Sequence, residues 1–328
     1  MSYAQWIKQF AANYRLKIAG KDSRPSPFVQ ELDRLAKMPL VYEDQELLDL
    51  ALDTMPLDRL YAEAERESTK DETWGMQDHL IRALLKWFRN DFFTWVNAPK
   101  CSSCSAETEG LGGTSPTPQE RADSAGRVEL YKCKSCGAIT RFPRYGHPRK
   151  LLTFRQGRCG EWANCFTLLC RALGSRARWV WNTEDHVWTE VYSEKQKRWI
   201  HADSCETAWD QPRLYEQGWG KKMSYAIAFS VEGAVDVSKK YIRTAKCQLP
   251  RKRITEIDLY NTLQRITTQR RAHLPPSEQA ALQLEDEDEQ AELYGYSNKL
   301  TPASTSEMRP RATGAGAWTA ARGEDGKH

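Results

Sequence analysis

Three short stretches decide the fold of this chain: GRCGEW at residues 157–162, DHVW at residues 185–188 and HADS at residues 201–204. They place a cysteine, a histidine and an aspartate in that order along the chain, at Cys159, His186 and Asp203. Thiol enzymes that transfer acyl groups need a nucleophile, a base to activate it and a carboxylate to orient the base. The three residues therefore predict an acyl-transfer thiol site, and the strength of that prediction depends on the sequence around each of them.

The sequence around Cys159 predicts a reactive thiol at the start of a helix. Gly157 and Gly160 allow a tight turn and a close approach of the backbone to a substrate. From Glu161 the apolar residues repeat with helical spacing as far as Gly174, and they are Trp162, Phe166, Leu169 and Leu173. The N–H groups and the dipole at a helix N-terminus favour a thiolate. The alternative is that Cys159 is a small buried apolar residue, as free cysteines often are.

Residues 186–192 and 199–203 alternate as strands do, which predicts a hairpin that carries the base and its carboxylate. A four-residue loop that pairs Tyr192 with Lys197 puts His186 directly opposite Asp203, where a hydrogen bond can form. A longer loop would make this pair diagonal. His186 could instead be an ordinary half-buried strand histidine. His201 is a rival base, but it shares a strand with Asp203 and would compete for the space that the substrate needs.

The cysteines predict a structural zinc ion in a reducing compartment. Two pairs with CxxC spacing, Cys101 with Cys104 and Cys133 with Cys136, are typical of a tetrahedral Cys₄ zinc site. Four thiolates leave no open position for chemistry, and a redox CxxC is the alternative. The odd count of nine cysteines, with no signal peptide, favours ligands and nucleophiles over disulfides. We expect the remaining thiols to be core or surface residues: Cys165, Cys170, Cys205 and Cys247.

Composition argues against nucleic-acid binding and membrane insertion, and it divides the chain into segments. The net charge of +4, without interleaved basic and aromatic residues, gives no support for nucleic-acid binding, and no apolar run is long enough to insert in a membrane. The expected segments are an N-terminal helical extension at 1–72, a helix and zinc module at 73–150, a catalytic core at 151–246, a C-terminal helical extension at 247–295 and a disordered tail at 296–328.

Two helices in these segments have definite expected bounds, Thr73 to Val96 and Thr255 to Ala272. A third is expected near the N-terminus, at residues 1–18, with an apolar stripe formed by Tyr3, Ile7, Phe10 and Tyr14. An unpacked terminal helix frays, so this stripe must be buried. It either packs on the chain's own core beside the helix at 255–272 or presents a face to a partner.

Several tryptophans suit contact with a sugar, because an indole offers an apolar face and an N–H donor. Trp188 and Trp199 share the strand faces of His186 and Asp203, and with Trp219 they are candidates for a ligand platform. The alternative is that they belong to the core.

The motifs together resemble those of cytoplasmic peptide:N-glycanases, in the compact fungal form, which belong to the transglutaminase-like superfamily. The motifs that carry the likeness are GRCGEWAN at 157–164, RWVWN at 178–182, EDHVW at 184–188, DSCE at 203–206 and KMSY at 222–225. The resemblance covers about Thr73 to Ile242 and implies an α+β fold, with a papain-like core of a helix packed on an antiparallel sheet. It also implies that Cys159, His186 and Asp203 are catalytic. The positions that it implies for chitobiose contacts are Arg178, Trp188, Glu190, Trp199, Glu206 and Trp219.

The resemblance implies hydrolysis of the bond between an asparagine side chain and an N-linked glycan on misfolded glycoproteins, in endoplasmic-reticulum-associated degradation. It implies a ubiquitin-receptor shuttle protein as a partner of the terminal helices, and a cytoplasmic location with the nucleus as a second one. Two alternatives stay open from the residues alone. One is a thiol protease or transglutaminase on the same fold, and the other is a catalytically silent glycoprotein-binding adaptor.

Overall fold

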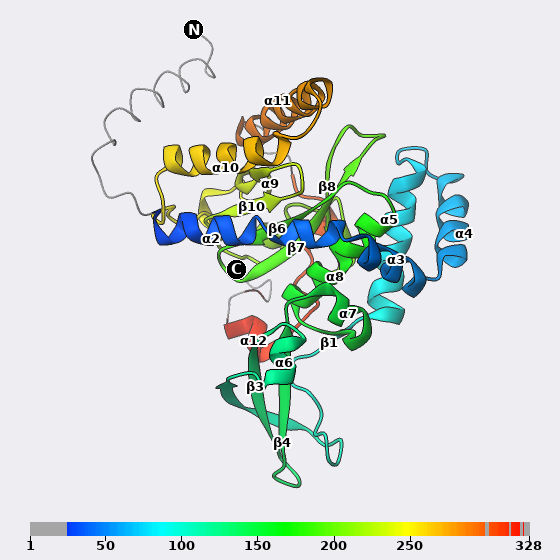
Figure 1. Cartoon of the computed structure of the whole chain (residues 1–328), viewed down its shortest axis with the longest axis vertical. Coiled ribbons are helices and arrows are strands. Elements are labelled where there is room, and N and C mark those ends of the chain that lie inside the picture. The colour runs from blue at the N-terminus through cyan, green and yellow to red at the C-terminus, as the bar shows by residue number, and fades with distance from the viewer. Residues whose placement is uncertain (1–24, 299–301, 315, 322–323, 325–328) are drawn as a thin grey trace.

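The computed structural model describes residues 25–298, 302–314, 316–321 and 324. The helix expected at residues 1–18 lies outside this range. A six-stranded antiparallel sheet forms the centre of the molecule, in the strand order β11-β10-β6-β7-β8-β9 (Figure 1). Its strands are β6 (Ala177–Asn182), β7 (His186–Ser193), β8 (Arg198–Asp203), β9 (Ala208–Trp209), β10 (Ala226–Phe229) and β11 (Ala234–Asp236). The expected α+β fold, a helix packed on an antiparallel sheet, is confirmed.

Helix α8 (Cys159–Ala172) packs on one face of this sheet. It begins where the sequence predicted, and Gly174 follows its end with φ of +79°. Its buried apolar side chains, Phe166 and Leu169 among them, join those of β7 in the largest apolar cluster. Thr167 of α8 also contacts Thr189 of β7 through their hydroxyl groups, 2.7 Å apart. The opposite face of the sheet carries a second cluster rich in aromatic residues.

The helices before the catalytic segment enclose α8 from another side. They are α2 (Pro27–Leu35), η1 (Met38–Glu43), α3 (Gln45–Thr54), α4 (Leu57–Ser68), α5 (Met76–Trp87) and the π-helical turn η2 (Phe88–Phe92). Leu47 of α3 and Leu84 of α5 share the largest apolar cluster with Phe166, so the hydrophobic core crosses the expected segment boundaries. The helix expected from Thr73 to Val96 ends earlier, because the chain turns at Phe92 into strand β1 (Thr94–Trp95), which pairs in parallel with β5 (Gln156–Gly157).

The cysteine pairs lie before β2 and at the turn from β3 to β4 of a separate three-stranded sheet, at the bottom of Figure 1. It comprises β2 (Thr108–Thr114), β3 (Ala125–Cys133) and β4 (Ile139–Tyr145), with the short helix α6 (Pro118–Ala122) between β2 and β3. Helix α7 (Pro148–Phe154) then leads back to β5, the short strand that precedes Cys159. We call β2, α6, β3, β4 and the two cysteine pairs the cysteine module. It precedes helix α8 in the chain, with α7 and β5 between them.

Two C-terminal helices cover the edge of the central sheet: α10 (Glu256–Arg271) and α11 (Pro276–Asn298). Helix α10 begins after Thr255, whose hydroxyl accepts a hydrogen bond from the Asp258 N–H, as expected of a capping residue. The acidic run on α11 is paired with arginines of the core. These ion pairs join Glu285 to Arg176, Glu289 to Arg178 and Asp286 to Arg271, with N–O distances of 2.5–2.7 Å.

Part of the segment expected to be a disordered tail is folded. Within it the structure describes η5 (Thr305–Met308) and α12 (Gly316–Ala321), and Glu307 and Thr313 are buried. The segment is rich in small polar residues, and this composition predicted disorder. Its backbone, however, donates hydrogen bonds to the buried carboxylate of Glu206, and composition does not reveal such contacts. No helix in the described part of the chain is both long enough and apolar enough to cross a membrane.

Candidate active site

Cys159 is the first residue of α8 and is partly buried. Gly157 is required here for a close approach within the protein, since a Cβ at this position would lie 2.5 Å from Cβ of Glu161. At Gly160 an added Cβ would meet nothing within 4 Å, so that side of the turn is open. The N–H groups of the first helical turn have no partner within the helix, which leaves them available to a substrate oxygen.

The His186 ring joins Cys159 to Asp203. Its Nε2 lies 2.9 Å from Oδ2 of Asp203, and among the described residues its Nδ1 has no nitrogen or oxygen partner. Burial raises the pKa of the Cys159 thiol, but its interaction with the neighbouring His186 ring outweighs burial and lowers it. Burial lowers the pKa of His186, whereas its contacts with Asp203 and Cys159 raise it, and the net shift is upward. Both directions favour a thiolate beside an imidazolium.

The hairpin register differs from the prediction, although the predicted contact between His186 and Asp203 is present. Tyr192 pairs with Trp199 and Ser193 with Arg198, so the loop begins one residue later than expected. The Ser193 hydroxyl accepts a hydrogen bond from the Gln196 N–H and donates one to Asp78 of α5, and these contacts hold Ser193 in the strand. His186 and Asp203 are therefore diagonal neighbours on one face, a separation that long side chains can cross.

Tyr215, which sequence reasoning missed, completes the surroundings of Asp203. Its hydroxyl donates to Oδ2 of Asp203 at 2.9 Å, and the backbone N–H of Cys205 donates to Oδ1 at 2.8 Å. Burial alone would raise the pKa of Asp203, but His186 and the Tyr215 hydroxyl outweigh it and hold this pKa well below its usual range. Tyr215 lies in the π-helical turn η3 (Leu214–Gly218), where no periodic pattern marks it in the sequence.

His201 is not the base. Its Nε2 contacts the Tyr215 hydroxyl at 2.7 Å, and its Nδ1 accepts a hydrogen bond from the Gln211 N–H at 3.3 Å. The acceptor role of Nδ1 places the ring proton on Nε2, so that His201 donates to Tyr215, which in turn donates to Asp203. Burial lowers the pKa of His201 to about 4, which keeps the ring neutral. It supports Tyr215 instead of activating Cys159.

Four of the candidates for chitobiose contact lie on strands of the central sheet, Glu206 and Trp219 lie outside the strands, and all six are buried by protein. The exposed fractions of the six are 3% for Arg178, 0% for Trp188, 0% for Glu190, 8% for Trp199, 2% for Glu206 and 0% for Trp219. The expected ligand platform at Trp188, Trp199 and Trp219 is therefore buried in this structure, and contact of these rings with a sugar stays a prediction. Part of the burial of the six comes from α11, whose Glu289 pairs with Arg178, and from Ala312 and Thr313, which bind Glu206. The sequence pattern of the strands could not show these contacts.

These candidates form two groups. Arg178, Glu190 and Trp199 form a structural cluster: the Arg178 guanidinium bonds Glu190 and Glu289 and lies 4.2 Å from the Trp199 ring centroid. Trp188 and Trp219 instead flank the triad, with ring centroids 5.7 Å and 5.0 Å from that of His186. Only the second group lies beside the reacting atoms, and its role in sugar binding stays a prediction.

The C-terminal segment contacts Trp219 of this second group and Glu206, the sixth candidate. The backbone N–H groups of Ala312 and Thr313 donate to the two carboxylate oxygens of Glu206, at 2.8 Å and 3.0 Å. The Arg311 guanidinium lies 4.5 Å from the Trp219 ring centroid, and its charge contributes to the lowered pKa of Cys159. Contact of Glu206 or Trp219 with a glycan therefore requires residues 302–313 to leave these positions.

The four cysteines of the CxxC pairs are close enough to hold one metal ion. The Sγ atoms of Cys101, Cys104, Cys133 and Cys136 all lie within 4.8 Å of one another. A tetrahedral site with metal–sulfur bonds of about 2.3 Å needs sulfur–sulfur separations of about 3.8 Å. The separations of 3.5–3.7 Å found between neighbouring sulfurs fit that geometry. Gly137, with φ of +75°, makes the tight turn expected after the second pair.

The sequence matches two family models: the transglutaminase-like superfamily at residues 110–204 and the Rad4 transglutaminase-like domain at residues 180–294. Among solved structures, the chain resembles one of Rad4–Rad23 crosslinked to an undamaged DNA. The TM-score is 0.50 and the identity 12%, over 94% of this chain and 62% of that one. At this identity the likeness concerns the fold alone. Fold and site together define a transglutaminase-like protein with a Cys–His–Asp site.

Curated relatives give the family. The peptide-N(4)-(N-acetyl-beta-glucosaminyl)asparagine amidase of Yarrowia lipolytica is 44% identical over 95% of this chain and 89% of its own length. That of Saccharomyces cerevisiae is 44% identical over 88% of this chain and 82% of its own. The Gallus gallus amidase is also 44% identical over 88% of this chain, which spans 45% of that longer relative. This chain belongs to the peptide-N(4)-(N-acetyl-beta-glucosaminyl)asparagine amidase family, which confirms the resemblance drawn from its motifs.

Proposed function

We propose that this protein hydrolyses the amide bond that joins the first sugar of an N-linked glycan to an asparagine side chain. The observation that carries the proposal is the contact chain from Cys159 through His186 to Asp203, in a chain 44% identical to amidases of this specificity. The substrates we propose are misfolded glycoproteins in the cytoplasm, with the nucleus as a second location.

The chemistry follows from the positions of the three side chains. The Cys159 thiolate attacks the asparagine side-chain carbonyl, and first-turn N–H groups of α8 can stabilise the oxyanion that forms. His186, as imidazolium, protonates the departing glycosylamine. The neutral ring then takes a proton from water, which cleaves the thioester and leaves aspartate on the peptide. Asp203 orients the ring and stabilises its charged form.

Incubation with a denatured N-glycopeptide tests the reaction. Mass spectrometry should find conversion of the glycosylated asparagine to aspartate, with the peptide backbone intact. Cys159→Ala should lower the rate by several orders of magnitude while the protein stays folded. Cys247→Ala is a control for the loss of a buried thiol, because the Cys247 Sγ contacts the Glu216 carbonyl and not a triad side chain. Binding without conversion would favour the adaptor, and backbone cleavage or crosslinking would favour the protease or transglutaminase.

We propose that the four clustered cysteines hold one structural zinc ion, which would fix the ends of β3 and of the loop before β2. Zinc sites of this kind contribute on the order of 10 kcal/mol of folding free energy. Cys133→Ser should therefore lose the metal, as measured by elemental analysis, and lower the melting temperature. A parent protein purified without chelator that contains no zinc would contradict the assignment.

We also propose that the terminal helices bind a ubiquitin-receptor shuttle protein. The support is the family resemblance together with the apolar residues that α11 exposes, Leu284 at 64% and Tyr294 at 63%. Deletion of residues 1–18 should abolish capture of the purified shuttle protein and spare glycopeptide hydrolysis. Loss of hydrolysis and of solubility would show instead that this segment belongs to the core.

A further inference from the structure

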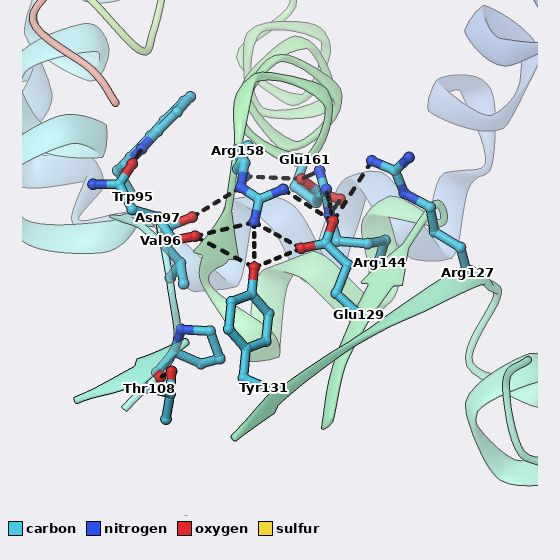
Figure 2. Close-up of polar contacts among 11 residues, drawn as sticks. Trp95, Val96, Asn97, Thr108, Arg127, Glu129, Tyr131, Arg144, Arg158 and Glu161 are labelled. Carbon is cyan, nitrogen blue, oxygen red and sulfur yellow. Dashed lines mark hydrogen bonds and ion pairs between the residues drawn. The ribbon is translucent and has the colours of Figure 1, made fainter. Parts of the chain in front are cut away.

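The residue before the nucleophile is held by the cysteine module (Figure 2). Arg158 of the turn before α8 donates from Nη1 and Nη2 to the two carboxylate oxygens of Glu129 on β3, at 2.9 Å and 2.7 Å. Its Nη2 also contacts the Tyr131 hydroxyl at 2.8 Å. A bidentate arginine–carboxylate contact fixes both distance and orientation. The backbone of Arg158, and therefore of Cys159, is thus positioned relative to β3.

A second arginine connects the module to the first turn of α8. Arg144 of β4 donates to both carboxylate oxygens of Glu161, at 2.7 Å each, and to Oε1 of Glu129 at 2.9 Å. Glu161 in turn accepts a hydrogen bond from the backbone N–H of Arg158 at 2.9 Å. Two arginines and two carboxylates therefore alternate in one closed network (Figure 2). Two of its members, Arg158 and Glu161, flank Cys159 in the sequence.

The network is well shielded from water, which makes it stiffer than a surface ion pair. Side-chain exposure is 10% for Arg144, 7% for Glu161 and about a fifth for Arg158 and Glu129. Burial raises the pKa of Glu129, but hydrogen bonds from Arg158 and Tyr131 outweigh it and hold the pKa at about 2. The Glu129 carboxylate therefore stays charged across the neutral pH range.

Both chain segments that hold Arg158 lead into the cysteine cluster. Strand β3, which carries Glu129, ends at Cys133. The segment after β1 accepts hydrogen bonds from Arg158 at the carbonyls of Val96 and Asn97, both at 3.1 Å, and runs on to Cys101. A metal ion that joins Cys101 to Cys133 would therefore fix the far ends of the two segments that position the nucleophile.

We propose that Glu129, Arg144 and Arg158 are positioning residues, through which the cysteine module holds Cys159 in line with His186. This inference extends the proposed function, because it assigns part of the catalytic geometry to a module that contacts no reacting atom. A misplacement of the nucleophile by about 1 Å can cost on the order of 100-fold in rate. The network is thus expected to act on kcat, and on the reactivity of Cys159, more than on KM.

Glu129→Gln tests the proposal, because it keeps the side-chain shape and removes the charge that both arginines share. Glu120→Gln is the matched control, since it breaks another bidentate pair of the same module, with Arg141, at 2.6 Å and 2.9 Å and without contact to α8. For each variant we would measure zinc content, melting temperature, kcat and KM. The rate of Cys159 alkylation by iodoacetamide would be followed against pH, with the labelled peptide identified by mass spectrometry.

Glu129→Gln should retain zinc, lower kcat on the order of 10- to 100-fold with little change in KM, and move the alkylation profile of Cys159 to higher pH. Arg158→Lys, which keeps the charge but not the bidentate geometry, should have an intermediate effect. The double variant Glu129→Gln/Arg158→Gln should be no slower than the slower single variant. Unchanged alkylation and kcat in both Glu129→Gln and Arg158→Lys would overturn the proposal, as would an equal loss in Glu120→Gln. Alkylation needs no glycopeptide, so it tests positioning even if the proposed amidase reaction fails.

Discussion

The Tyr215 hydroxyl and the His186 ring both donate to Oδ2 of Asp203, each at 2.9 Å. One carboxylate oxygen is thus shared between His186 and a tyrosine from a different part of the chain. Because Tyr215 also contacts His201, the triad is one end of a longer buried chain of hydrogen bonds. The alignment of His186 therefore depends on groups that never reach the substrate.

Tyr215→Phe tests this dependence. It removes one donor from Asp203 and leaves the Nε2–H of His201 without its acceptor, so we expect a loss of about 1–3 kcal/mol in stability and a several-fold lower kcat. Tyr42→Phe is the control, because its buried hydroxyl donates to Asn164 at 2.7 Å, away from the triad. Equal effects of both variants on kcat would show that Tyr215 acts through stability alone.

The pH dependence of Cys159 reactivity follows from the directions of the two pKa shifts. His186 lowers the pKa of Cys159, so the thiolate should persist at pH values well below the usual thiol range, and alkylation should remain fast there. His186→Gln removes the imidazolium, and the alkylation profile should then move to higher pH. An unchanged profile in this variant would exclude a thiolate–imidazolium pair. The same titration of Asp203→Asn should show a smaller shift in the same direction.

Trp199→Ala should lower the stability of the protein and leave its affinity for a sugar ligand unchanged. The ring lies beneath the guanidinium groups of Arg178 and Arg176, at 4.2 Å and 5.6 Å, and contacts the Tyr192 ring at 5.4 Å. Its removal should cost about 3 kcal/mol of unfolding free energy, measured by denaturant titration. The folded variant should bind a chitobiose ligand with the affinity of the parent. Weaker binding at unchanged stability would restore Trp199 as a glycan contact.

Removal of residues 302–328 should open the site. This segment places Arg311 against Trp219 and satisfies the Glu206 carboxylate, so its loss should expose both residues beside the triad. Alkylation of Cys159 by a bulky maleimide should become several-fold faster, compared at the plateau of each pH profile because Arg311 also lowers the pKa of this thiol. Iodoacetamide is the small-reagent control and should change less. Slower labelling by both reagents would show that the segment supports the site instead of covering it.

Local sequence patterns were sufficient for the catalytic helix, for the strand faces of His186 and Asp203 and for the cysteine cluster. The repeat of Trp162, Phe166 and Leu169 located the catalytic helix, because i, i+4 and i+7 spacing depends only on helix geometry. Alternation placed His186 and Asp203 on the same sheet face for a similar reason. The spacing of Cys101, Cys104, Cys133 and Cys136 was enough to predict their convergence.

Only the tertiary structure decided the contacts between residues that lie far apart in the chain. Asp78 of α5 helps to fix the hairpin register through Ser193, Glu289 of α11 pairs with the buried Arg178, and residues 302–313 contact Glu206 and Trp219. The bonds between Arg158 and Glu129 likewise join two segments that no periodicity relates. Short-range patterns are set by backbone geometry and can be read from the sequence, whereas burial and register depend on which distant segment packs against each face.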